Sequence, residues 1–156
     1  MTDCCHTAPL HLRHNFKTEE MNFVSIRIIT DRLDELVAFY EQVTGKTAVR
    51  YTPDFAELKT ATATLAIGST KTLLFFGGEA IARPAQNSSV ILEFRVDDVE
   101  KDYARLAAYL EDRIVQKPTA MPWGNTSLLF RDPDGNLVNL FTPATPEAIA
   151  KFDNSN

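Results

Sequence analysis

The chain has 156 residues, a formal net charge of −5 and a hydrophobic fraction of 44%. This length suits one domain with a substantial core, and this composition is typical of a globular protein rather than a disordered one. The acidic balance argues against nucleic acid and anionic membrane surfaces as main partners, because both require basic patches.

The N-terminal segment contains all the cysteine and histidine of the sequence. Cys4 and Cys5 are adjacent, and adjacent cysteines form strained disulfides, so we expect no structural bridge. Together with the histidines at positions 6, 11 and 14, they fit no zinc-binding spacing. We interpret residues 1–20 as a flexible tail. The lack of a basic and then apolar leader, and of any apolar run of membrane-spanning length, predicts a cytoplasmic protein.

Beyond this tail, the same sequence pattern occurs twice. Residues 23–30 are rich in β-branched side chains, which predicts a strand, and apolar residues at helical spacing follow as far as Gly45. Residues 89–96 and the segment after them repeat this strand and helix, with Asp31 and Asp97 as the expected helix N-caps. The two stretches align without a gap, which indicates an internal duplication.

Three further strands are expected after each helix, so the chain is predicted to contain two tandem βαβββ units, at about residues 22–78 and 88–143. The run Asp132–Asn136 is expected to form a tight turn, and Thr145 to cap a short helix within residues 144–156. The expected strands are about 48–51, 58–67 and 71–76 in the first unit, and about 113–117, 126–131 and 136–142 in the second.

These features together resemble the vicinal oxygen chelate superfamily, which includes glyoxalase, bleomycin resistance proteins and extradiol dioxygenases. The resemblance covers about residues 21–143. It implies an α+β fold in which the two units form an open, eight-stranded, barrel-like cavity for a small molecule, in one chain or across a homodimer. The motifs that carry it are the Ala-Phe-Tyr run at 38–40, Val-Asp-Asp-Val at 96–99, Met-Pro-Trp-Gly at 121–124 and Asp-Pro-Asp-Gly-Asn at 132–136.

Metal-using members of this superfamily hold a divalent ion with a His in the first strand of each unit and a Glu in the last strand. None of the four corresponding positions in this sequence carries His or Glu. The resemblance therefore points to the metal-free, bleomycin-resistance-like branch, and we expect no metal and no cofactor. The four positions are Ser25 (or Val24 in a shifted register), Ile91, Asn139, and Leu73 or Leu74.

Alternation along the first strand of each unit directs one set of side chains toward the expected cavity. Ser25 and Arg27 share this face in the first unit, and Glu93 lies on it in the second. Arg27 and Glu93 occupy equivalent positions. They are expected either to form a partly buried ion pair, to bind a polar ligand, or to lie on a solvated face.

Three polar or aromatic side chains of the second unit complete the predicted ligand-binding set. Trp123, the only tryptophan, lies on a loop ahead of a strand, where its ring can stack on a planar ligand or pack on the sheet as a lid. Asn125 and Asn139 can hydrogen-bond a ligand, and Asn139 occupies the family position that faces the cavity.

The hypothesis is a metal-independent, antibiotic-resistance-like protein that sequesters an aromatic or amphiphilic compound. We expect it to be a homodimer, because open sheet edges need cover. A lyase, isomerase or dioxygenase-type enzyme of the same superfamily is the alternative, and a regulatory or structural module is a third reading. No nucleophile–base arrangement is found beyond the tail, so no catalytic residue is assigned.

Overall fold

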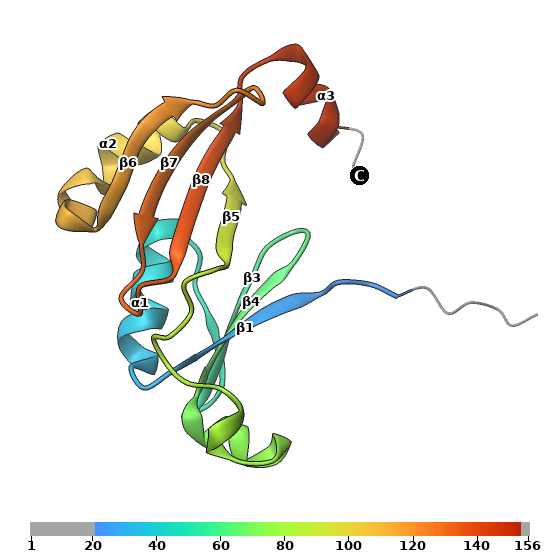
Figure 1. The fold of residues 1–156 in the computed structure, drawn as a ribbon, viewed down its shortest axis with the longest axis vertical. Helices are drawn as coiled ribbons and strands as arrows, with labels where there is room; N and C mark the ends of the chain where they lie inside the picture. The colour runs from blue at the N-terminus through green and yellow to red at the C-terminus, as the bar shows by residue number, and fades with distance from the viewer. Residues whose placement is uncertain (1–20, 154–156) are drawn as a thin grey trace, which may run out of the picture.

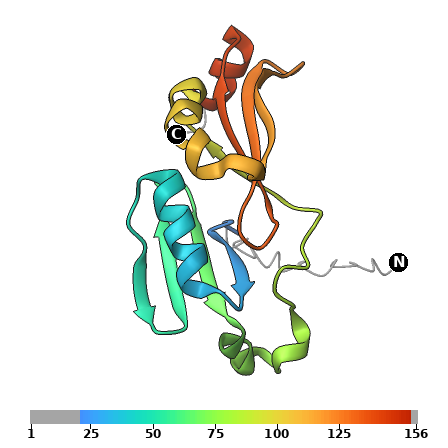
Figure 2. The ribbon, with the colours of Figure 1, turned by 90° about the vertical axis from the view of Figure 1, so that its left-hand side faces the viewer.

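A computed structural model of the chain describes residues 21–153. The predicted tail at 1–20, with its cysteines and histidines, lies outside the described residues. In Figure 2 the first unit, in blue and green, lies below the second, in yellow to red. The elements of the first unit are β1 (Ser25–Thr30), α1 (Leu33–Thr44), β2 (Val49–Thr52), β3 (Phe55–Lys59) and β4 (Thr64–Ser69).

The second unit has the same order of elements. It is joined to the first by two short 3-10 helices, η1 (Thr70–Phe76) and η2 (Glu79–Ile81). Its elements are β5 (Ile91–Arg95), α2 (Val99–Leu110), η3 (Glu111–Arg113), β6 (Ile114–Ala120), β7 (Asn125–Arg131), β8 (Leu137–Pro143) and the C-terminal α3 (Pro146–Asp153).

The two sheets have equivalent topologies. The strand orders are β1-β4-β3-β2 and β5-β8-β7-β6, and in each sheet the first strand runs parallel to the last strand of its unit. The remaining pairs are antiparallel. This architecture confirms the predicted α+β class and the doubled unit (Figure 1). None of the helices between residues 21 and 153 is long and apolar enough to span a membrane.

Both helices begin one residue later than the sequence indicated. The N-cap of α1 is Arg32, whose backbone N–H donates to Thr30 Oγ1 at 2.9 Å, so the expectation that Asp31 is the cap is wrong. The N-cap of α2 is Asp98 rather than Asp97, and its carboxylate accepts from the N–H groups of Glu100 and Lys101. Hydrogen bonds to the charged form lower the pKa of Asp98, with the Lys101 N–H as the largest cause.

The expected strand at 71–76 is wrong, because this segment is the 3-10 helix η1. Thr72 Oγ1 donates to the Ser69 carbonyl at 2.8 Å, which turns the chain immediately after β4. The segment ends at Gly77, whose φ of 116° is a conformation that favours glycine. The last strand of the first unit is therefore β4, which pairs with β1.

The expected single strand at 58–67 is two strands, β3 and β4, joined by a turn. Thr60 closes this turn, because its Oγ1 donates to the Ala63 carbonyl at 2.7 Å and accepts from the Ala63 N–H at 3.1 Å. The chain thus reverses within a run of alternating Thr and Ala, and we call residues 60–64 the Thr-rich hairpin.

Both units contribute to one hydrophobic core that surrounds α1 and α2. Phe39 of α1 packs against Phe130 of β7, with ring centroids 6.1 Å apart. The buried Tyr40 hydroxyl donates to Asp132 Oδ2 at 2.7 Å, across the boundary between the units. A shared core and a buried cross-unit hydrogen bond make the two units one folding body.

The Asp132–Asn136 turn forms between β7 and β8, as predicted. The Asp132 carboxylate accepts the N–H groups of Asp134 and Asn136 at 3.0 and 2.8 Å. Arg32 of the first unit donates to the Pro133 carbonyl and, at 2.9 Å, to Asp134 Oδ1. The paired carboxylates of this turn therefore fix local structure, which agrees with their interpretation as turn residues.

Candidate ligand-binding site

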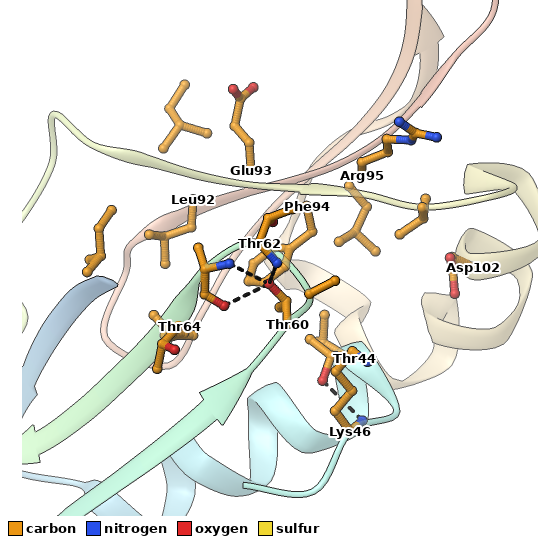
Figure 3. Close-up of a pocket in the computed structure, with 18 of the residues that line it drawn as sticks. Thr44, Lys46, Thr60, Thr62, Thr64, Leu92, Glu93, Phe94, Arg95 and Asp102 are labelled. Carbon is orange, nitrogen blue, oxygen red and sulfur yellow. Dashed lines mark hydrogen bonds between the residues drawn. The ribbon is translucent and has the colours of Figure 1, made fainter. Parts of the chain in front are cut away.

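A cavity of about 540 Å³ lies between the two units (Figure 3). One wall is β5, from which Leu92 and Phe94 point into the hollow, and the opposite wall is the Thr-rich hairpin with Thr60, Thr62 and Thr64. Part of the remaining apolar lining comes from the start of the described chain, from the first sheet and from β8. These residues are Phe23, Ile26, Leu65 and Leu140.

Charged groups lie at the rim of this cavity. Lys46 follows α1, Asp97 precedes α2, and Asp102 is on the first turns of α2. Asp102 is already paired with Arg105 at 2.7 Å, and Arg105 also donates to the carbonyls at the end of α1. The hollow thus combines an apolar interior with a hydroxyl-bearing and charged edge, as ligand sites commonly do.

Of the predicted set, only Glu93 is among the residues that line the cavity. Figure 3 shows Glu93 and Arg95 pointing away from the cavity. Glu93 accepts a hydrogen bond from Asn139 Nδ2 at 2.9 Å, and the two residues are cross-strand neighbours on β5 and β8. The structure therefore joins these two members of the predicted set, on the face of the second sheet that is turned away from α2.

This face of the second sheet holds several buried polar atoms without hydrogen-bond partners among the described residues. Asn139 Oδ1 and Ser127 Oγ are two of them, and their side chains are only 7% and 1% exposed. Gln116 Nε2 and Asn125 Oδ1 are two more. Such groups are costly unless water or a ligand bonds them, so the face has unused hydrogen-bonding capacity.

The helix α3 packs against this face. Phe152 stacks against Phe141 of β8 with ring centroids 5.3 Å apart, and Arg95 donates to the Phe152 carbonyl at 3.3 Å. Thr145 caps the helix as predicted, since its Oγ1 accepts from the Ala148 N–H at 3.3 Å. The turn before β7 holds the N-terminal end of α3, because the Thr145 N–H also donates to the Gly124 carbonyl.

Two further members of the predicted set, Trp123 and Asn125, lie away from the cavity lining. Trp123 lies in the β6–β7 turn and is 66% exposed. Asn125 begins β7 beside it. Neither shares a recorded contact with Glu93 or Arg27, so the structure does not join these two residues to the rest of the set.

Arg27 and Ser25 lie on the face of the first sheet that is turned away from α1. Arg27 does not meet Glu93; its guanidinium carbon lies 4.8 Å from the ring centroid of Phe55 and 5.5 Å from that of Phe76. Ser25 pairs with Thr64 across β1 and β4. The interpretation of Arg27 and Glu93 as an ion pair is therefore wrong.

The register of the two sheets identifies the positions that metal-using relatives would need. Arg27 faces Ala66 as Glu93 faces Asn139, so the last-strand position of the first unit is Ala66, and the assignment to Leu73 or Leu74 is wrong. The complete set is Ser25, Ala66, Ile91 and Asn139.

These four side chains do not fit a divalent metal, since two are apolar and the others offer only neutral oxygens. Among the side chains that the structure describes, no group of three or more His, Cys, Asp or Glu could hold a metal ion. The side chains at these four positions therefore do not fit the divalent metal site that metal-using members of the family have.

Sequence pattern alone did not predict that the Thr-rich hairpin forms a cavity wall. Residues 60–64 alternate Thr and Ala and continue an apolar pattern, so they resemble part of a strand. The informative signal is the lack of any large apolar side chain in this run, which leaves space beside Phe94 and Leu92.

The chain has a duplicated βαβββ topology, in which each unit forms a four-stranded sheet and contributes one helix, α1 or α2. This topology defines its structural class. The model of the Glyoxalase/Bleomycin resistance protein/Dioxygenase superfamily matches residues 22–140, and the chain belongs to this family. No curated protein sequence is a significant match to the chain.

Several solved structures have the same fold. A glyoxalase/bleomycin resistance protein/dioxygenase from Nocardioides has a TM-score of 0.67 and 20% identity, over 84% of this chain and 89% of that one. A family enzyme from Burkholderia phytofirmans PsJN has a TM-score of 0.66 and 19% identity, over 76% and 96%. Lactoylglutathione lyase from Agrobacterium tumefaciens has a TM-score of 0.58 and 24% identity, over 79% and 94%.

Proposed function

We propose that this protein binds and sequesters an amphiphilic or aromatic small molecule in the cavity between its two units, without a metal ion. The observation that carries the proposal is the 540 Å³ hollow with its apolar walls and polar rim. Ligand pockets are typically about 300–1,000 Å³, so the hollow can take most of a drug-sized molecule.

The distribution of side chains favours an amphiphile. Leu92 and Phe94 supply apolar surface on one wall, while Thr62 and Thr64 on the opposite wall carry hydroxyls and Lys46 adds a charged group to the lining. A ligand with an apolar body and a polar end would bury its body against β5 and keep its polar end in water.

The donor set at the family's metal positions supports binding rather than metal-assisted turnover. Ser25, Ala66, Ile91 and Asn139 offer no charged ligand for an ion. This supports the proposal that the protein belongs to the metal-free branch of the family and has a sequestering role of the bleomycin-resistance type.

The neutral fluorophore N-phenyl-1-naphthylamine, an aromatic probe, tests the proposal on the full chain. After treatment with a chelator and dialysis, the protein is expected to bind the probe with unchanged affinity. Ala63→Trp fills the cavity from the Thr-rich hairpin, and we expect it to weaken binding by about tenfold or more, since the bulky ring occupies the ligand volume.

The matched control is Ala108→Trp, which adds the same ring at an exposed position of α2 outside the cavity lining. It should leave probe binding unchanged. Binding that appears only when a divalent ion is added back, together with stoichiometric metal by elemental analysis, would reject metal-independent binding and favour a lyase or dioxygenase-type activity. Equal loss in the two variants would reject the cavity as the site.

A further inference from the structure

The cavity between the two units has an apolar end and a charged end. Its wall β5 leads from Leu92 toward Asp97, which follows the strand. In Figure 3, Leu92 and Thr64 lie on one side of the hollow, and Lys46 and Asp102 lie on the other. A ligand that lies along β5 therefore meets apolar surface with one end and charged groups with the other.

The apolar end is formed where the two sheets have their first strands. Phe23 precedes β1, Ile26 lies on β1, and Ile91 begins β5. Ile26 and Ile91 are 36% and 47% exposed, although both line the hollow. The stretch from Leu92 to Val96 is about 13 Å long, because an extended chain rises about 3.3 Å per residue. This length suits a ligand whose apolar body has two fused rings.

Two charged side chains at the other end are already bonded to the protein. Arg105 donates to Asp102 Oδ1 at 2.7 Å. Its guanidinium also donates to the carbonyls of Gln42 and Val43, in the last turn of α1, at 2.9 and 2.8 Å. These bonds hold the end of α1 against α2 and occupy the charges of both side chains, so this pair is not the anchor for a ligand.

One ammonium and one carboxylate remain at this end. Lys46 follows α1 and Asp97 precedes α2, and both residues are exposed members of the lining. With the side chains that the structure describes, the charged group of neither residue forms an ion pair or a hydrogen bond. Glu93 and Arg95 belong to the lining as well, but their side chains point away from the hollow. The charged end thus presents one charge of each sign to a ligand.

This arrangement distinguishes between head groups. A cationic head would be attracted by Asp97 and repelled by Lys46, and an anionic head would meet the opposite combination. A head that carries both charges can direct its carboxylate to Lys46 and its ammonium to Asp97. Because both residues are exposed, each ion pair contributes modestly, and a clear preference requires both.

We propose that the ligand of the cavity is a zwitterionic amphiphile, with its apolar body along β5 and an ammonium–carboxylate head between Lys46 and Asp97. An α-amino acid with a large apolar side chain has this chemistry. The assignment rests on the proposed function, because it names the chemical class of the compound that the cavity takes, and it adds the two residues that select the head group.

Three compounds that share a naphthyl ring with the fluorescent probe test this assignment. At pH 7, 3-(1-naphthyl)alanine is a zwitterion, 2-(1-naphthyl)ethylamine is a cation and 3-(1-naphthyl)propionate is an anion. Inhibition constants are measured on the full chain by displacement of N-phenyl-1-naphthylamine at low ionic strength. We expect the zwitterion to bind about fivefold more tightly than either analogue, and this preference to fall as salt is added.

Two substitutions separate the two ion pairs. Lys46→Met removes the partner of the ligand carboxylate, so the zwitterion should bind no more tightly than the amine. Asp97→Asn removes the partner of the ammonium, so the zwitterion should bind no more tightly than the acid. Lys101→Met and Asp112→Asn are the matched controls, because both residues are exposed and lie outside the cavity lining, and they should keep the preference.

The possible outcomes separate this assignment from the proposed function. Equal affinities of the three compounds for a wild-type chain that binds the probe would overturn the zwitterionic head group and leave the cavity as the binding site. Equal effects of the cavity variants and their matched controls would overturn it as well. A wild-type chain that does not bind the probe would reject both the proposed function and this assignment.

Discussion

At the scale of single residues, one buried hydroxyl connects the two units. Tyr40 is fully buried in α1, and its hydroxyl donates to Asp132 at 2.7 Å. Asp132 also accepts hydrogen bonds from the backbone and the side chain of Asn136, so both of its carboxylate oxygens have hydrogen-bond donors. Burial, and then the negative charge of Asp132, raise the pKa of Tyr40 well above its ordinary value.

The change Tyr40→Phe should lower the free energy of unfolding at pH 7 by about 1.5–3 kcal/mol, the usual range for a hydrogen bond to a charged group. The measurement is urea denaturation followed by far-ultraviolet circular dichroism. The control is Tyr109→Phe, because the Tyr109 side chain is substantially exposed. A loss no larger than that of the control would show that this bond does not hold the units together.

The same pair predicts how stability depends on pH. The pKa of Tyr40 is raised in the folded state, so its contribution is complete below the unfolded tyrosine pKa of about 10 and is lost as the pH rises beyond it. The slope of unfolding free energy between about pH 9 and 11 should therefore be shallower in Tyr40→Phe than in the wild type.

At the scale of secondary-structure elements, α3 is held through the turn that precedes β7. Gly124 has a φ of 92°, and its carbonyl accepts the N–H groups of Ala144 and Thr145 at 2.8 and 3.1 Å. A side chain at this position would collide with Thr145 and come within 3.2 Å of the Ala148 side chain. The close approach of the turn to α3 thus requires glycine.

Gly124→Ala should lower the free energy of unfolding and release α3 from the second sheet. Gly135→Ala is the matched control, because Gly135 has a similar φ of 86° but open space around it. The difference between the variants isolates the collision with α3, and we expect about 1–3 kcal/mol. Hydrogen exchange should rise along residues 146–153 only in Gly124→Ala, and equal exchange in both variants would contradict this role.

Much of the element order was predictable from sequence, and the exceptions have physical reasons. The strand–helix pairs have strong periodicity, so they and the turn at 132–136 were found. The segment 71–76 was misread because a short run such as Leu-Leu-Phe-Phe does not distinguish a strand from a helical turn. In the structure β4, not the segment 71–76, pairs with β1, and this pairing joins residues about forty positions apart, which local sequence pattern does not reveal.

The site was less predictable than the fold. Glu93 and Asn139, both in the predicted set, share a hydrogen bond on one face of the second sheet. Alternation along the strand of Glu93 predicted that this side chain would point toward the cavity. It could not reveal that the cavity lies on the opposite side of β5, because that hollow depends on how the Thr-rich hairpin packs between the units. Nor could local pattern show that Phe76, expected in a strand, would lie over Arg27.

At the scale of the whole molecule, the 3-10 helix η1 carries three consecutive exposed apolar side chains. Leu74, Phe75 and Phe76 of η1 are 62%, 89% and 62% exposed, and Figure 1 shows η1 and η2 projecting at one end of the first unit. Contiguous exposed apolar side chains commonly mark an interface. They support the expectation of a homodimer, which we retain as a proposal.

The change Phe75→Glu should shift the protein from dimer to monomer, because it places a charge in the proposed contact. Size-exclusion chromatography with light scattering gives the molar mass. Val115→Glu, at an exposed position on β6, is the control and should preserve the dimer. A wild-type chain that is monomeric at high micromolar concentration would refute the proposed dimer.

The bond between Tyr40 and Asp132 has a consequence for the symmetry of the duplicated chain. The residue of α2 equivalent to Tyr40 is Leu106, which has no hydroxyl, and the first unit has the Thr-rich hairpin where the second has the Asp132 turn. The two halves are therefore complementary rather than interchangeable. Two copies of the C-terminal half could not form the hydrogen bond between Tyr40 and Asp132, because neither copy contains Tyr40. A circular permutant that keeps both halves should retain this hydrogen bond.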